Sequence, residues 1–341
     1  MKLSPQERAQ FALERDDYRD LIRYIRSPRQ EPAQNTLDLT CIGNTGGAHN
    51  VVHGRPAGGM LLRTAGRTII IDPGDNSIAY MTSLGLNPYS ITDVAASHAH
   101  NDHVGDLSLA ISAALTLGLK DESESDSHFL VSPSLVDYGS PNATKLGFTV
   151  PAYAWKGRVH ALCSRDMEIL RFDGASIAST QQVRIVDSLS VTAAPAHHGQ
   201  VQVTGFVFDT PIGRLGYTGD TEYFPELAAA YQGADVLWMN MNTLALDAID
   251  DTRPTCPKTA APVHYHLGYV GVCNLIEAVR PTTAFVSHLG AQLLPQREAI
   301  QALLRNRFAD TGITIYCPDN GDRYSFVSTL SRPPSVGRFV P

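Results

Sequence analysis

The sequence Ser97-His98-Ala99-His100-Asn101-Asp102-His103-Val104-Gly105-Asp106 decides how the rest of the chain is interpreted. Three histidines and an aspartate lie within six positions of it, directly after the apolar run 94–96, which is typical of a buried strand. In an extended segment His98 and His100 can face the same point, whereas Asp102 and His103 lie where the chain turns and can face a second point. Imidazole and carboxylate groups placed in this way suit two neighbouring metal ions and favour zinc among the common divalent cations. The alternative is a polar surface loop that is rich in histidine by chance.

The bulk properties of the chain limit the classes of protein to which it can belong. Its 341 residues are 43% hydrophobic, which is typical of a globular protein with a substantial core. The formal net charge of −7 argues against a broad nucleic-acid-binding surface. No apolar run has the length of a membrane span, and the first residues lack the apolar core of a signal peptide. The five cysteines are scattered and form no CxxC pair, so we expect reduced thiols in a cytoplasmic protein.

Strand and helix patterns divide the chain into three parts. Residues 1–36 begin with a capping box and continue with an amphipathic pattern, so we expect a helical appendage that packs on its own domain or on the second subunit of a homodimer. Residues 37–330 show strands, then a helix, then strands and helices again, without a linker or a repeat. This order predicts one α/β (α+β) domain in which two sheets lie between helices, with an insertion at about 120–165. Residues 331–341 are rich in Pro, Ser and Arg and are expected to form a C-terminal tail.

Further histidines and aspartates recur at the ends of separate predicted strands or at the start of a helix. They are His197, His198, Asp220, His266 and His288. Ligands that come from several strand ends onto one face would allow a sandwich of two sheets to build a metal centre. Asp72 also ends a predicted strand, and it can either orient a ligand histidine or simply form a turn.

These residues resemble the pattern of the metallo-β-lactamase-fold hydrolase superfamily. Its hallmark is HxHxDH, then a lone histidine, an aspartate after a glycine, and a final histidine; the first motif is residues 98–103 here, and the resemblance covers roughly residues 37–330. It implies a four-layer αββα sandwich and two divalent ions, with zinc expected and manganese as the alternative. By position it implies these metal ligands: His98, His100 and His198 for one ion, Asp102, His103 and His288 for the other, and Asp220 bridging both. His198 is preferred to His197 because related sequences place the ligand directly before the glycine.

His266-Leu267-Gly268, upstream of His288, resembles the ribonuclease Z-like branch of this superfamily, which consists of phosphodiesterases. In those enzymes the extra histidine donates a proton to the leaving oxygen, so the resemblance implies that Asp102 and His266 are catalytic. A metal-bridging hydroxide would attack phosphorus, Asp102 would accept or orient the proton of the water, and His266 would protonate the leaving alkoxide. A helix-capping or core role for His266 is the alternative.

Two departures from ribonuclease Z favour a smaller substrate. No flexible basic arm can be identified, and Leu267 stands where those enzymes have an acidic residue. Binding of transfer RNA requires a surface lined with lysine and arginine. We therefore expect the substrate to be a small-molecule phosphodiester such as a cyclic nucleotide, and we expect neither extended nucleic acid nor a membrane as a partner. The alternatives are a ribonuclease Z-type endonuclease, another hydrolase of this fold acting on a lactone, β-lactam, thioester or sulfate ester, and a non-catalytic scaffold or sensor.

Overall fold

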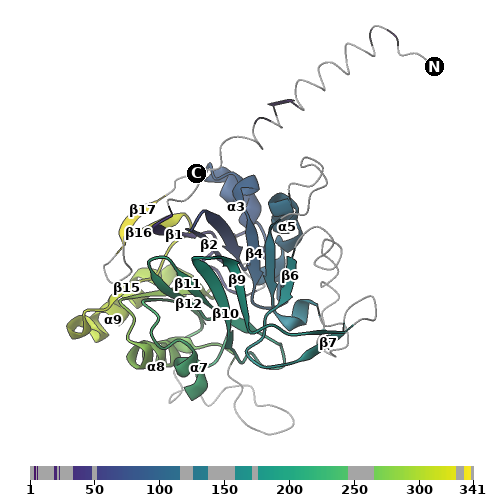
Figure 1. Cartoon of the computed structure of the whole chain (residues 1–341). Helices are drawn as coiled ribbons and strands as arrows, with labels where there is room; N and C mark the ends of the chain where they lie inside the picture. The colour runs from purple at the N-terminus through teal and green to yellow at the C-terminus, as the bar shows by residue number, and fades with distance from the viewer. Residues whose placement is uncertain are drawn as a thin grey trace.

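Two sheets lie face to face between helices in the computed structural model (Figure 1). The structure describes residues 34–47, 52–115, 126–136, 158–170, 176–244, 265–327 and 334–338, together with residues 4, 6, 19, 20 and 23. The predicted four-layer αββα sandwich is confirmed. None of the helices in these residues has the length and apolar character needed to cross a membrane.

The first sheet has eight strands in the order β17-β16-β1-β2-β3-β4-β5-β6. They are β1 (Thr36–Cys41), β2 (Met60–Thr64), β3 (Arg67–Ile71), β4 (Asp93–Ala96), β5 (His128–Val131), β6 (Arg158–Ala161), β16 (Asp322–Val327) and β17 (Ser335–Arg338). Strands β3 to β6 run parallel to one another, so their carboxyl ends meet at one edge of the sheet. Asp72 follows β3 at this edge, and the HxHxDH motif follows β4.

The second sheet has seven strands in the order β15-β14-β13-β12-β11-β10-β9. They are β9 (Gln182–Val186), β10 (Leu189–Pro195), β11 (Thr204–Thr210), β12 (Gly213–Tyr217), β13 (Val236–Asn242), β14 (Thr283–Leu289) and β15 (Thr314–Tyr316). Strands β12 to β15 are parallel, and their carboxyl ends also meet at one edge. Asp220 follows β12 and His288 lies near the end of β14. A separate hairpin joins β7 (Glu168–Leu170) and β8 (Ser176–Ala178).

Alternating side chains along the strands build three apolar layers. Leu62 of β2 and Trp238 of β13 face the layer between the sheets, where fully buried aromatic rings from both sheets pack together. Leu61 faces the opposite way, onto α3 (Ser77–Ser83) and α5 (Leu107–Leu115). Leu237 faces α7 (Pro225–Ala230), α8 (Gly268–Val279) and α9 (Arg297–Arg307) on the outer side of the second sheet. Because successive side chains of a strand point to opposite faces, each sheet buries apolar side chains on both of its faces.

The other helices whose bounds lie in the described residues are short. They are α4 (Asn101–Val104) and the 3-10 turns η1 (Pro88–Ser90), η2 (Pro133–Leu135), η4 (Leu294–Gln296) and η5 (Ala309–Thr311).

Two parts of the chain supply strands that the sequence pattern did not predict. β5 and β6 lie inside the predicted insertion 120–165, and these residues complete the first sheet instead of forming a loop. β17 lies inside the predicted C-terminal tail and pairs with β16 at the sheet edge, so 335–338 are not a loose tail. Each of the three strands has only four residues, too few for alternation to be recognised among polar neighbours. The appendage predicted for 1–36 lies almost wholly outside the described residues.

His128 and His160 pair across β5 and β6, away from the strand ends just described. Their rings stack with centroids 5.2 Å apart, and His128 Nδ1 lies 3.1 Å from His160 Nε2. Burial lowers the pKa of both imidazoles, and together with the charge of His128 it lowers the pKa of His160 to about 4. The pair is therefore uncharged at neutral pH.

This pair should make the fold sensitive to acid. An unfolded histidine has a pKa near 6.5, so as the pH falls the unfolded state takes up protons before the folded state does, and stability is lost between about pH 6.5 and pH 4. Between pH 7 and pH 5 we expect His160→Gln to lose about 1 kcal/mol less unfolding free energy than the unmodified protein, after allowance for solvent screening. Urea unfolding at both pH values measures the difference, and an identical pH dependence of the two proteins would contradict it.

Candidate metal centre

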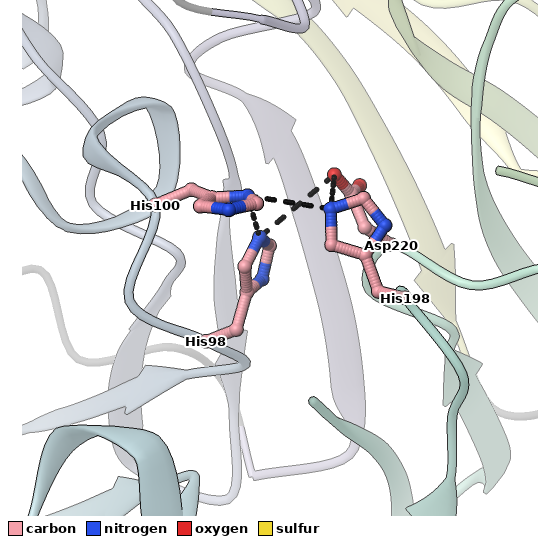
Figure 2. Close-up of side chains that lie close together, drawn as sticks. All are labelled: His98, His100, His198 and Asp220. Carbon is pink, nitrogen blue, oxygen red and sulfur yellow. Dashed lines mark hydrogen bonds and ion pairs between the residues drawn. The ribbon is translucent and has the colours of Figure 1, made fainter. Parts of the chain in front are cut away.

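Four ligand-type side chains converge in the first half of the site (Figure 2). His98 and His100 follow β4, His198 follows β10, and Asp220 follows β12. His98 Nε2 lies 3.0 Å and His198 Nε2 lies 3.3 Å from His100 Nδ1. The same two Nε2 atoms lie 3.9 Å and 3.8 Å from Asp220 Oδ2. Three ring nitrogens and one carboxylate oxygen thus surround one point.

Three further side chains form a second group beside the first. Asp102 and His103 lie in α4, and His288 lies in β14. His103 Nε2 is 3.7 Å and His288 Nε2 is 3.5 Å from Asp102 Oδ2. Asp220 reaches this group too, since its Oδ2 is 3.3 Å from His103 Nε2 and its Oδ1 is 3.3 Å from His288 Nε2. Its carboxylate faces both groups, as a bridging ligand must.

The donor atoms fit divalent metal ions. Tetrahedral zinc holds nitrogen at about 2.0–2.1 Å, which places neighbouring donors about 3.3 Å apart, and the distances within both groups lie around this value. His103 Nε2 and His288 Nε2 are buried and have no hydrogen-bond partner among the described residues, and a bound cation would give both nitrogens the partner that they lack. Imidazole and carboxylate donors suit zinc, iron and manganese.

Hydrogen bonds behind the imidazoles decide which nitrogen faces the site. The fully buried carboxylate of Asp72 accepts from Ser97 N at 2.6 Å and from the Tyr217 hydroxyl at 2.7 Å. The Asp72 carboxylate also lies 2.8 Å from His103 Nδ1. Ser97 Oγ donates to this carboxylate and lies 3.0 Å from His98 Nδ1. These contacts place a proton on Nδ1 of both rings and leave Nε2 as the donor to a metal. Of the two interpretations of Asp72, the structure supports the orienting role, and the φ of 49° shows that the residue also forms the turn.

The glycine-rich turn 43–47 closes one side of the site. Gly47 N donates to Asp102 Oδ2 over 2.6 Å. Gly46 has no room for a side chain, because a Cβ there would lie 2.5 Å from His288 Cδ2. Gly46 N also donates to Leu289 O over 3.1 Å, which ties the turn to the end of β14. This support for Asp102 was not predicted from the sequence, because a backbone N–H leaves no residue-type signal.

Burial and mutual charge set the protonation of the site. Burial raises the pKa of Asp220, but the imidazoles of His288 and His103 outweigh burial and hold this pKa well below its usual value. The same balance lowers the pKa of Asp102. Burial, reinforced by the charge of His103, holds the pKa of His98 well below its usual value. Ionised carboxylates and neutral imidazoles are the forms that bind metal ions.

His103 behaves in the opposite way. Burial lowers its pKa, but the carboxylates of Asp220, Asp102 and Asp72 outweigh burial and raise the pKa well above its usual value. Metal binding at this ring therefore displaces a proton.

His266 lies beside Asp220 in a cleft of about 650 Å³ that opens onto the site. Its Nδ1 is 3.6 Å from Asp220 Oδ2, is buried, and makes no hydrogen bond with a described residue. Its Nε2 lies 2.8 Å from Asn242 Nδ2, which fixes the ring. Burial lowers the pKa of His266 to about 4, although Asp220 acts in the opposite direction. The ring is therefore neutral at pH 7 before substrate binds.

The neighbours His197 and His198 point in different directions. His198 Nδ1 lies 2.5 Å from the carbonyl oxygen of Tyr265, which leaves Nε2 to face the site. The His197 side chain is 58% exposed and stacks on Phe224, with ring centroids 3.9 Å apart. It lines a cavity of about 450 Å³ to which His198 also contributes. The structure brings His198 and not His197 to the ligand groups.

Comparisons with known proteins agree with this geometry. Residues 59–114 match the family model described as the metallo-beta-lactamase superfamily, and residues 145–289 match the one described as the beta-lactamase superfamily domain. The chain is a metallo-β-lactamase-fold, metal-dependent hydrolase.

This metallo-β-lactamase-fold hydrolase is similar to proteins of known sequence or structure. It is 24% identical to the uncharacterized protein MJ1374 of Methanocaldococcus jannaschii over 283 residues, which are 79% of this chain and 96% of the relative. Its fold is similar to a diphosphatase of the PhnP family (14% identity, TM-score 0.54, 86% of this chain and 98% of the other). It is also similar to the short form of human tRNase Z (16% identity, TM-score 0.50, 85% and 99%). At these identities the two structures establish the shared fold.

We expect the hydrolase, once stripped with a chelator, to bind two divalent ions per chain. His198→Gln removes a donor from the first group and His103→Gln removes one from the second, so each variant should retain one ion. His197→Gln is the matched control and should retain two. Equilibrium dialysis against zinc followed by elemental analysis counts the ions; loss of an ion in His197→Gln with none lost in His198→Gln would reverse the assignment.

Asp72→Asn should weaken zinc binding about 10–100-fold, because an amide cannot accept from Ser97, Tyr217 and His103 together. Tyr217→Phe, which removes one donor and keeps the carboxylate, should have a smaller effect. Competition with a chromogenic chelator gives both affinities. Wild-type affinity in Asp72→Asn would show that Asp72 only forms the turn.

Proposed function

We propose that this hydrolase is a phosphodiesterase and that it cleaves a small phosphodiester, for example a cyclic nucleotide. The observation that carries the proposal is the position of His266, whose unpaired Nδ1 lies 3.6 Å from the carboxylate shared by the two ligand groups. The Nδ1 atom of this ring therefore faces the place where a substrate would meet both groups. Bound there, two divalent cations would activate a water molecule and stabilise the charge of the phosphoryl oxygens.

The side chains of the site would bind the cations and orient the attacking water. His98, His100, His198 and Asp220 would hold one cation, and Asp102, His103, His288 and Asp220 the other. Asp102 has a lowered pKa and is fixed by Gly47 N, so it is better suited to orient water than to take up its proton.

His266 would act on the leaving oxygen. Its low pKa means that it starts neutral, and the negative charge of a bound phosphodiester would raise that pKa. The ring could then give a hydrogen bond or a proton to the departing alkoxide, while Asn242 keeps it in place.

Two observations favour phosphorus chemistry on a small molecule. Proteins of similar fold include a PhnP-family diphosphatase and a tRNase Z, whose names denote phosphoryl substrates. The net charge of −7 is unfavourable for gripping a polynucleotide. The expected homodimer and cytoplasmic location stay predictions.

We expect zinc-loaded protein to hydrolyse bis(p-nitrophenyl) phosphate and cyclic mononucleotides, and to leave a transfer-RNA precursor intact. His266→Ala should lower kcat about 10²–10⁴-fold with both ions still bound, because a general acid contributes a factor of this order. His197→Gln controls for the loss of a histidine near the site. Turnover of a lactone or carboxylic ester that survives His266→Ala would point to another hydrolase of this fold, and an inert metal-loaded protein would point to a scaffold or sensor.

A further inference from the structure

Tyr265 is a large aromatic residue that stays exposed beside the metal centre. It is 44% exposed, it directly precedes His266, and it lines the same cleft. Most large apolar side chains in the described residues are buried in the three core layers. An exposed ring in a cleft with convergent polar groups is a common feature of ligand recognition.

The backbone of Tyr265 is tied to the metal centre. Its carbonyl oxygen is the partner of His198 Nδ1, and its ring lies edge-on to the His198 ring, with centroids 5.9 Å apart. The ring also lies against Gly199, where a Cβ would collide with Cε1 and Cδ1, and where the φ of +61° itself favours glycine. The ring is therefore held at a set distance from the ligand groups.

The cleft combines two kinds of surface. Asp102, Asp220 and His266 lie at one part of it, and Ala99, Val201 and Tyr265 add apolar wall. A phosphate held at the metal ligands would leave the tyrosine uncovered, whereas a planar ring attached to that phosphate could cover it. With two cations bound, a positively charged group would be repelled, so a neutral ring is the better occupant.

We propose that Tyr265 is the stacking platform for the nucleobase of a nucleoside phosphodiester. The inference rests on the proposed function, because it assumes that the phosphoryl group lies at the metal ligands. It narrows the substrate class from phosphodiesters in general to those that carry a nucleoside. Base–aromatic stacking is tolerant of base identity, so little discrimination among bases is expected.

The test is a binding measurement, which does not depend on turnover. Isothermal titration of zinc-loaded protein with adenosine 5′-monophosphate and with ribose 5-phosphate compares two ligands that share a phosphate and a sugar and differ in the base. We expect the nucleotide to bind about tenfold more tightly, the order of effect known for one base stacked on an aromatic ring. Tyr265→Ala should bring the ratio close to one, and Tyr265→Phe should retain it.

Two further variants make the result specific. Leu303→Ala removes an equally exposed apolar side chain (52%) on α9 and should keep the tenfold ratio. Tyr265→Leu keeps bulk against Gly199 without an aromatic ring, so it should lower the ratio even if Tyr265→Ala does not fold. A ratio near one in the unmodified protein, or a tenfold ratio that survives in Tyr265→Ala or Tyr265→Leu, would overturn the inference. An intact ratio in a protein that hydrolyses no phosphodiester would overturn the proposed function and leave the platform standing.

Discussion

The structure depends on a carboxylate that is buried where it cannot be neutral. Asp220 is 1% exposed, and its pKa is held well below the usual value, so a negative charge is buried where the parallel strands of the two sheets end. A buried charge is costly unless it is paired. Asn240 Nδ2 donates to Asp220 Oδ1 over 3.0 Å, but burial lowers the pKa of His98 and of His100 in the first group, so these two rings supply no counter-charge. The imidazoles of His288 and His103 hold the pKa of Asp220 down, and divalent cations bound by the two ligand groups would supply further positive charge to Asp220 and Asp102.

The sandwich brings these groups together because both sheets end their parallel strands at the same place. Asp72 connects them: it follows β3 of the first sheet and accepts a hydrogen bond from Tyr217 of β12 in the second. The same carboxylate orients His103 and, through Ser97, His98. Asp72 thus joins the two sheets by a hydrogen bond and also determines which nitrogen of His98 and of His103 faces the metal site. The stability of the fold and the affinity for metal are therefore coupled at Asp72.

Much of this could be predicted from the sequence, for physical reasons. Metal ligands come from a few residue types, chiefly His, Cys, Asp and Glu, so HxHxDH, His198, Asp220 and His288 are visible as residue types at strand ends, and the structure brings all of them together. The short strands β5, β6 and β17 were missed, because four residues among polar neighbours give no periodicity. The groups that orient the ligands were less visible. Gly47 N and the Tyr265 carbonyl act through the backbone. Tyr217 becomes a partner of Asp72 only when the two sheets pack, and Asn240 becomes a partner of Asp220 only when β13 pairs with β12.

The most direct test is anomalous diffraction from crystals of the zinc-loaded protein, measured on both sides of the zinc absorption edge. Two anomalous peaks should appear, one at the nitrogens of His98, His100 and His198 and one at Asp102, His103 and His288, with the carboxylate of Asp220 between them. A single peak remote from Asp220, or an Asp220 side chain turned away from both groups, would contradict the account.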